Sequence, residues 1–246
     1  MTQPGTGAPG LWTTPVRGRA ALSALAWVVV YMTGLVVVVV LGLLGARAAG
    51  TGRPDTALLA LVVLAGTAVA ALVAVRVHLL RRRGLGWADV GLRRPARSPL
   101  HLLWQIPAVM LAGAVASMVV LLPLGVGPEA DAGDEAIAEL ALGGPLIAVL
   151  GLLAVAVIVP VAEEVIFRGI VLPALRARLT AVPGIAVAGA VFAAVHLLPP
   201  ALPYLLVVGI SLGIMAQWYR SIVPGIVLHG VNNAVVFGAV VAAGAA

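Results

Sequence analysis

The sequence predicts an all-α protein, a polytopic membrane helix bundle with about seven transmembrane helices. The chain of 246 residues is 62% hydrophobic and only 10% charged, whereas soluble domains carry about 25% charged residues. The deficit extends along the whole chain and includes charge-free runs long enough to cross a bilayer. These observations exclude the soluble and the disordered classes of protein.

The N-terminal part, residues 20–128, is predicted to form the first three spans. Residues 1–19 are rich in Gly, Pro and Thr and are expected to be a disordered cytoplasmic tail. Residues 20–46 carry no charge and exceed the ~7–15 apolar residues of a signal peptide, so they read as a retained span. Spans at 56–75 and 98–128 follow, on either side of a basic cytoplasmic loop, residues 76–97.

The C-terminal part, residues 142–244, is predicted to form four further spans after an acidic loop. The fourth span begins near Leu142 and continues towards Arg176. The fifth and sixth share one charge-free run that Pro199-Pro200 divides, and the seventh follows Arg220. The acidic loop holds Glu129, Asp131, Asp134, Glu135 and Glu139.

The arginines predict the orientation. The second predicted loop carries the arginines of residues 76–97, the fourth carries Arg176 and Arg178, and the sixth carries Arg220. The acidic loop is the third, so it falls on the opposite side of the membrane. By the positive-inside rule the protein is a multi-pass protein of the cell (plasma) membrane with its N-terminus in the cytoplasm. Partners are therefore expected to be the lipid bilayer and no nucleic acid. All 15 basic residues are Arg, a bias typical of GC-rich bacterial genes.

Two adjacent carboxylates lie within a predicted span, where charge is costly. Glu163 and Glu164 are the two of the nine acidic residues that fall outside predicted loops. An ionisable group there costs at least ~2.5–3.5 kcal/mol and is a candidate for function. Arg168 follows Glu164 by one turn and can neutralise it, while Glu163 points about 100° away. A simpler alternative is that this pair marks the cytoplasmic end of the fourth span.

Two more polar positions favour a catalytic site. His196 ends an apolar stretch with Phe192 one turn before it, and His229 lies one turn before Asn233. Taken singly, a membrane histidine is more often a packing residue. Together these groups can supply a general base, a proton carrier and an oxyanion donor. The chain has no Cys, no H-E-x-x-H and no Asp within a predicted span, which disfavours cysteine and aspartyl chemistry.

The ordered trio E-E-x-x-x-R, F-x-x-x-H and H-x-x-x-N resembles the motifs of the CPBP family. These are CAAX-protease and bacteriocin-processing, Abi or Rce1-like, intramembrane proteases. The three motifs begin at Glu163, Phe192 and His229, and the resemblance covers about residues 145–240. Residues 87–95, WADVGLRRP, are also similar to a cytoplasmic stretch of bacterial members.

The resemblance implies a peptide-bond hydrolase acting on a peptide or membrane-protein substrate. Glu163 would activate water with the help of His196, and His229 with Asn233 would bind the oxyanion. Glu164 and Arg168, with Phe192, would support the site. Members are often described as metalloproteases, and Glu163, His196 and His229 are candidate ligands for one divalent metal such as zinc. The sequence leaves metal-dependent and metal-free mechanisms open.

Two other functions remain as alternatives. A non-catalytic membrane scaffold or immunity protein of the same fold would keep the motifs without using them. A proton-coupled transporter also places Glu, His and Arg in the membrane, but its typical inverted repeat is not evident.

The orientation is testable with reporter fusions. Fusions after Arg83 and Arg178 are expected to report the cytoplasm, because arginine-rich loops stay inside. Fusions at Asp131 and Ala246 are expected to report the outside. A cytoplasmic signal at Asp131 would contradict the seven-span model.

Overall fold

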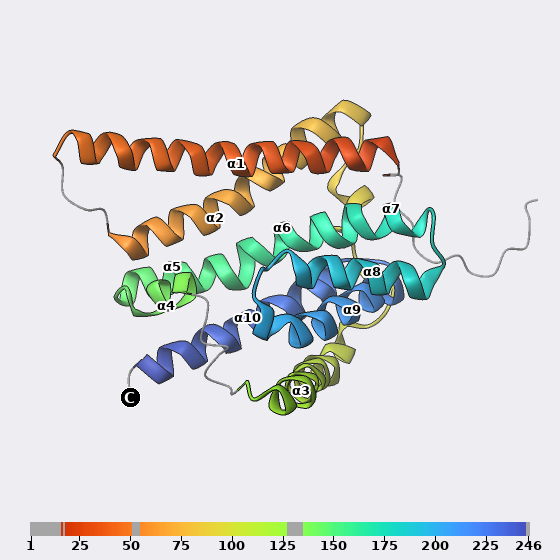
Figure 1. The fold of residues 1–246 in the computed structure, drawn as a ribbon. Helices are drawn as coiled ribbons and strands as arrows, with labels where there is room; N and C mark the ends of the chain where they lie inside the picture. Colours follow the sequence, from red (N-terminus) through yellow and green to blue (C-terminus); the bar gives the residue numbers. More distant parts are fainter. Residues whose placement is uncertain (1–15, 17, 51–54, 127–134, 245–246) are drawn as a thin grey trace, which may run out of the picture.

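The protein is an all-helical membrane bundle in a computed structural model that describes residues 16, 18–50, 55–126 and 135–244 (Figure 1). Within these residues there is no strand, six helices are long and apolar enough to cross a membrane, and one more is apolar but shorter. The predicted fold class is therefore confirmed. Residues 1–15 and 17 of the predicted tail, and the acidic residues 129, 131 and 134, lie outside the described residues.

The first two helices form an antiparallel pair. They are α1 (Arg19–Ala48) and α2 (Thr56–Ala74), and α2 continues directly into the π-helix η1 (Val75–Arg81) (Figure 1). The prediction that a loop begins at Arg76 is therefore wrong, because the helix runs past it. Long arginine side chains can carry their charge from a helix end to the membrane surface, so charge here does not end the helix.

The third span packs against the C-terminal half of the chain. It runs as η3 (Pro99–His101), α3 (Leu102–Leu121) and η4 (Leu122–Leu124), and α3 lies against α9 (Leu202–Tyr219). The predicted span at 98–128 thus corresponds to one helical unit that ends at Leu124.

A helix replaces part of the predicted acidic loop. Glu135–Leu142 form α4, and the fourth span begins after it, at Pro145, rather than near Leu142. Glu139 accepts a hydrogen bond from the Thr56 hydroxyl (2.7 Å), while Leu140 is fully buried. The segment is helical because its apolar side packs on neighbouring helices. The prediction of a loop considered only the acidic residues and not this apolar side.

The fourth span, Pro145–Arg176, carries both predicted site carboxylates and is irregular in two places. Its parts are α5 (Pro145–Leu153), η6 (Ala154–Ile158), α6 (Val159–Ile166), η7 (Phe167–Val171) and α7 (Leu172–Arg176). Both η6 and η7 are π-helical, and a proline follows each of them, Pro160 and Pro173. A proline lacks an N–H and clashes with the carbonyl four residues back, so a wider turn accommodates it.

The last three helices include one that is short. They are α8 (Ala181–Ala194), α9, preceded by η8 (Pro199–Ala201), and α10 (Val223–Gly244). The division at Pro199-Pro200 is as predicted. With 14 residues, α8 is ~21 Å long, less than the ~30 Å hydrocarbon core. By length, its C-terminal end falls inside the membrane.

A segment between η1 and α3, which includes η2 (Trp87–Val90), covers the turn from α9 to α10. The Ile222 N–H donates to Gly91 O (3.0 Å), and the Ser221 hydroxyl donates to Arg93 O (2.6 Å). Ser221 and Ile222 are fully buried. The first turn of α10 is therefore fixed by a segment of the N-terminal half.

α10 approaches the fourth span closely at Gly230. A Cβ at this position would overlap the backbone oxygen of Ala156 in η6. A backbone oxygen cannot move aside as a side chain can, so Gly230 lets the two helices meet.

This contact makes a matched pair of substitutions informative. Gly230→Ala is expected to destabilise the protein by about 1–3 kcal/mol through overpacking. Gly238→Ala, in the same helix with nothing within 4 Å of the added Cβ, is expected to be neutral or stabilising, because Ala favours helix. Thermal unfolding in detergent measures both. Equal behaviour of the two variants would contradict the close approach.

Candidate active site

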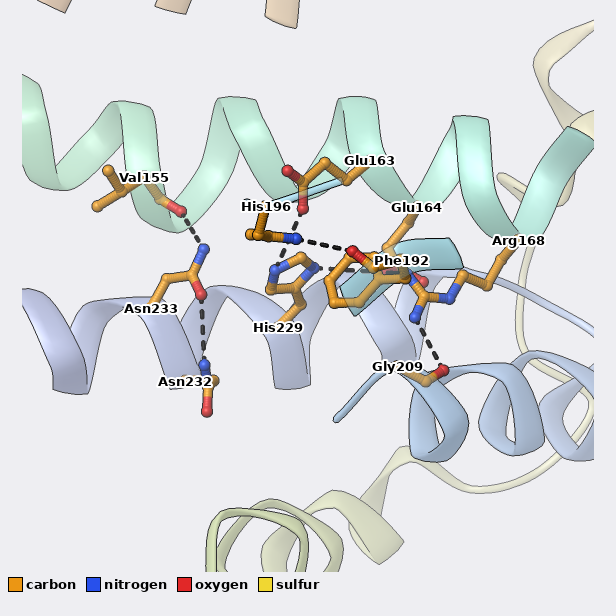
Figure 2. Close-up of polar contacts among 10 residues, drawn as sticks. All are labelled: Val155, Glu163, Glu164, Arg168, Phe192, His196, Gly209, His229, Asn232 and Asn233. Atoms are coloured by element: carbon orange, nitrogen blue, oxygen red, sulfur yellow. Dashed lines mark hydrogen bonds and ion pairs between the residues drawn. The ribbon is translucent and has the colours of Figure 1, made fainter. Parts of the chain in front are cut away.

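His229 on α10 lies between two carboxylates of α6. Its Nε2 is 3.5 Å from Glu163 Oε2, and its Nδ1 is 3.4 Å from Glu164 Oε1 (Figure 2). A neutral imidazole has one N–H, whereas a protonated imidazole has two. A neutral His229 ring can therefore donate to one of the two carboxylates, and donation to both would need the second ring proton. The first and third motifs therefore meet in direct contact.

Glu164 and Arg168 form a buried ion pair, as the i, i+4 spacing predicts. Arg168 Nη1 is 2.6 Å from Glu164 Oε1, and the two side chains are 2% and 0% exposed. Arg168 Nη2 also donates to Gly209 O on α9 (3.0 Å) (Figure 2). A buried charge is tolerated only when it is paired and hydrogen-bonded. The pair therefore fixes α6 and η7 against α9.

Phe192 on α8 connects the second motif to the other two. Its fully buried ring lies under the Arg168 guanidinium, 4.5 Å from ring centroid to Cζ. The same ring contacts the rings of His196 (4.8 Å) and His229 (5.6 Å), each edge-to-face. The predicted supporting role of Phe192 thus has a structural basis in its contacts with three site residues.

His196 occupies the turn that follows the short helix α8. Its Nδ1 is 2.8 Å from Phe192 O, and since a carbonyl oxygen only accepts, Nδ1 carries the proton of this bond (Figure 2). The neutral ring therefore presents Nε2 as a proton acceptor. Because α8 ends early, this histidine lies within the span and not at a membrane surface.

Asn233 is attached to the fourth span rather than to the carboxylates. Its amide donates to Val155 O in η6 (2.9 Å) (Figure 2). The Val159 N–H bonds Ala154 O five residues back, and the next donor in that pattern would be Pro160, which has none. Val155 O is thereby left for Asn233. This bond uses one of the two hydrogens of the Asn233 amide, so the second hydrogen remains available as a donor.

Sequence reasoning gave no role to two residues that hold Asn233 in place. Asn232 donates to Asn233 Oδ1 (3.3 Å), and Tyr204 on α9 donates to Asn232 Oδ1 (2.5 Å). A second amide beside Asn233, and a tyrosine within an apolar run, were the available signals. Neither reveals the pairing, which joins residues 28 positions apart.

Glu163 is the more accessible of the two carboxylates. Its side chain is 24% exposed, whereas that of Glu164 is 0% exposed. Oε2 is buried and without a hydrogen-bond partner in both carboxylates among the described residues, so the exposed surface of Glu163 lies elsewhere on its side chain. Glu163 can accept a hydrogen bond from water, and Glu164 is committed to Arg168.

The candidate metal ligands do not assemble into a site. Among the described residues, no group of three His, Cys, Asp or Glu side chains has the spacing to hold a metal ion. Both nitrogens of His229 face carboxylates, and His196 Nδ1 is bonded to Phe192 O. The chemistry of the site is therefore derived from its side chains alone.

The comparisons with known proteins agree with these motifs. Residues 145–235 match the family model of the type II CAAX prenyl endopeptidases, Rce1-like. This segment is Rce1-like. The predicted family resemblance is thereby confirmed for this segment, and the six long apolar helices indicate a multi-pass membrane protein. No curated protein and no solved structure matches the chain.

The Rce1-like segment coincides with the irregular helices. It begins at Pro145, the first residue of α5, and ends two residues after Asn233. It contains all seven predicted site residues, while α1 and α2 lie outside it.

Removing Arg168 tests the buried pair. Arg168→Ala is expected to destabilise the protein by about 3–5 kcal/mol, because Glu164 would remain buried without a partner. The double variant Glu164→Gln with Arg168→Met is expected to recover part of this loss, since no unpaired charge remains. Unfolding in detergent measures both, with exposed Arg178→Ala as a control expected to change stability by less than about 0.5 kcal/mol. Arg168→Ala as stable as Arg178→Ala would contradict the pair's role.

Proposed function

We propose that the protein is an intramembrane endopeptidase in which Glu163 activates water to hydrolyse a peptide bond. The observation that carries the proposal is the position of His229 between an accessible carboxylate and a buried one. Two adjacent glutamates in different environments can perform different tasks. Glu163 supplies the base, and Glu164 holds the histidine and the arginine in place.

The attack begins at Glu163. A water molecule hydrogen-bonded to this carboxylate transfers a proton to it as its oxygen bonds to the peptide carbonyl carbon. The carbonyl oxygen then carries negative charge. Protonated Glu163 afterwards gives its proton to the peptide nitrogen and the C–N bond breaks, which releases an amine and a carboxylic acid. The acid then loses its remaining proton to the amine, which leaves a carboxylate and an ammonium group.

His229 and Asn233 are placed to stabilise the oxyanion. His229 faces Glu163 and Asn233 lies one turn further along α10, with one amide hydrogen held by Val155 O. The second amide hydrogen and the histidine N–H are donors for one oxygen on this side of Glu163. In an apolar surrounding such donors stabilise charge more strongly than in water.

His196 assists by holding or relaying a proton. Its Nδ1–H is fixed on Phe192 O, so Nε2 is the nitrogen that accepts. Phe192 holds this ring beside His229 and excludes water from that side.

The substrate class follows from the location of the site. Glu163, His229 and Asn233 lie on helices long enough to cross a membrane, so the peptide bond must belong to a membrane protein or to a membrane-associated or lipidated peptide. A soluble peptide would have to leave water to reach Glu163.

The test is peptide cleavage by the purified protein. Glu163→Gln keeps shape and hydrogen bonding but cannot take a proton from water, so turnover of a peptide and lipidated-peptide pool is expected to fall ~10²–10⁴-fold. Glu139→Gln, a matched change in α4 far along the chain from the site, is expected to retain full activity. His229→Ala and Asn233→Ala are expected to lose ~10²–10³-fold. Mass spectrometry of the products measures each rate.

Two results would overturn the proposal. Full activity in Glu163→Gln would refute the mechanism, and absence of cleavage by the wild-type protein would favour the scaffold or immunity alternative. A chelator titration is expected to leave the rate unchanged, because the candidate ligands do not assemble. Activity lost with chelator and restored by Zn²⁺ would instead assign the water to a metal.

A further inference from the structure

A second polar site lies in the N-terminal half, outside the Rce1-like segment. A cavity of about 310 Å³ is lined by Ala20 and Ser23 of α1 and by His78, Arg82 and Arg83 at the end of the second span. None of these residues belongs to the candidate active site, and none of them is acidic. The cavity has the size of a small ligand site.

The histidine of this cavity is held rigidly and has an unused nitrogen. The Trp27 ring stacks on His78 with centroids 3.9 Å apart and planes 9° apart. Tyr31 Oη is 3.1 Å from His78 Nε2, while Nδ1 is buried and has no hydrogen-bond partner in the described part of the chain. When the Tyr31 hydroxyl donates to Nε2, Nδ1 carries the proton. Nδ1–H is then a buried donor without an acceptor, which is costly unless a ligand supplies one.

The positive charges of the cavity lie beside this donor. Arg82 and Arg83 are exposed, and the Arg82 Cζ lies 6.0 Å from the Trp27 ring centroid. Ala20 lies in the first turn of α1, at the end of the helix whose dipole favours an anion. His78 is part of the π-helix η1, an irregularity that is often found at functional sites. Every polar group of the lining except Ser23 is thus suited to an anion.

The surroundings indicate a ligand that comes from the membrane. Leu22 and Val29 on α1, close to the cavity in sequence, are 63% and 61% exposed, and exposed apolar side chains on a membrane helix face lipid. Trp27 and Tyr31 are the aromatic types that gather at the membrane–water interface. The cavity lies at the end of the bundle where α1 begins and η1 ends, the arginine-rich end (Figure 1).

We propose that this cavity binds the phosphate of an anionic phospholipid headgroup. Arg82 and Arg83 pair with the phosphate oxygens, since guanidinium and phosphate form strong, often bidentate hydrogen bonds. His78 Nδ1–H donates to a third oxygen, and the acyl chains lie along the exposed side of α1. Basic pockets between transmembrane helices are a recognised mode of lipid binding. The site does not depend on the proposed peptidase activity.

Lipid binding by the full chain in detergent tests the proposal. Native mass spectrometry with phosphatidylglycerol and with phosphatidylcholine gives the number of bound lipids and the dissociation constants. Phosphatidylglycerol is expected to bind more tightly, and Arg82→Gln with Arg83→Gln is expected to weaken it about tenfold or more. The matched control, Arg76→Gln with Arg81→Gln, removes the same charge from exposed neighbours that do not line the cavity, and is expected to change affinity little.

The source of the phosphate is distinguished by glycerol 3-phosphate. Binding of this soluble ester as tightly as phosphatidylglycerol, with the same dependence on Arg82, would overturn the lipid assignment and leave a soluble phosphate ester as the ligand. Equal weakening in the two double variants would show attraction by overall charge and overturn the site. Unchanged unfolding temperatures in both variants confirm that the fold is intact, so loss of binding reports the cavity.

Discussion

The buried ion pair of Glu164 and Arg168 decides which helices must meet. A carboxylate that is fully removed from water within an apolar span is tolerable only with a cation and further hydrogen bonds. Arg168 uses one nitrogen for Glu164 and another for Gly209 O, so α9 must approach η7 closely. Glycines permit that approach: a Cβ at Gly209 would lie 2.9 Å from Gly189 O on α8. The charge of one side chain thus fixes the packing of three helices.

The same requirement explains why the C-terminal half is irregular and the N-terminal pair is regular along most of its length. At each irregular position a missing backbone hydrogen bond or a missing side chain allows a contact that the site depends on. Pro160 leaves Val155 O without its helical donor, and Asn233 supplies one. Gly230, three residues before, lets α10 come close enough for that bond. The early end of α8 places His196 inside the span. α1 and α2 carry none of the candidate site residues. Their side chains pack against neighbouring helices or contact lipid.

Local spacing made the contact between Glu164 and Arg168 predictable from the sequence, while contacts between helices were not predictable. The Glu164–Arg168 pair follows from i, i+4 geometry, and the ordered motifs predicted that their helices belong together. No periodicity could show that His229 contacts both carboxylates, since this depends on the rotation of α10 against α6. The sequence did not predict the helix α4, because its acidic residues indicated a loop although one side of the helix is apolar. The position of residues 87–95 over the α9–α10 turn depends on backbone hydrogen bonds, which side-chain patterns do not encode.

The N-terminal helix pair packs on the face of the fourth span that turns away from the candidate site. Val165 and Ile170 are fully buried in one cluster with residues of α1, α2 and η1, among them Val28 and Leu79. Glu164 and Arg168, their near neighbours in sequence, point to the opposite side, towards α9 and α10. The N-terminal pair therefore supports the helix of the carboxylates from behind without supplying a catalytic group. That support includes η1, so the helix that carries His78 belongs to the same packed cluster as the back of the fourth span.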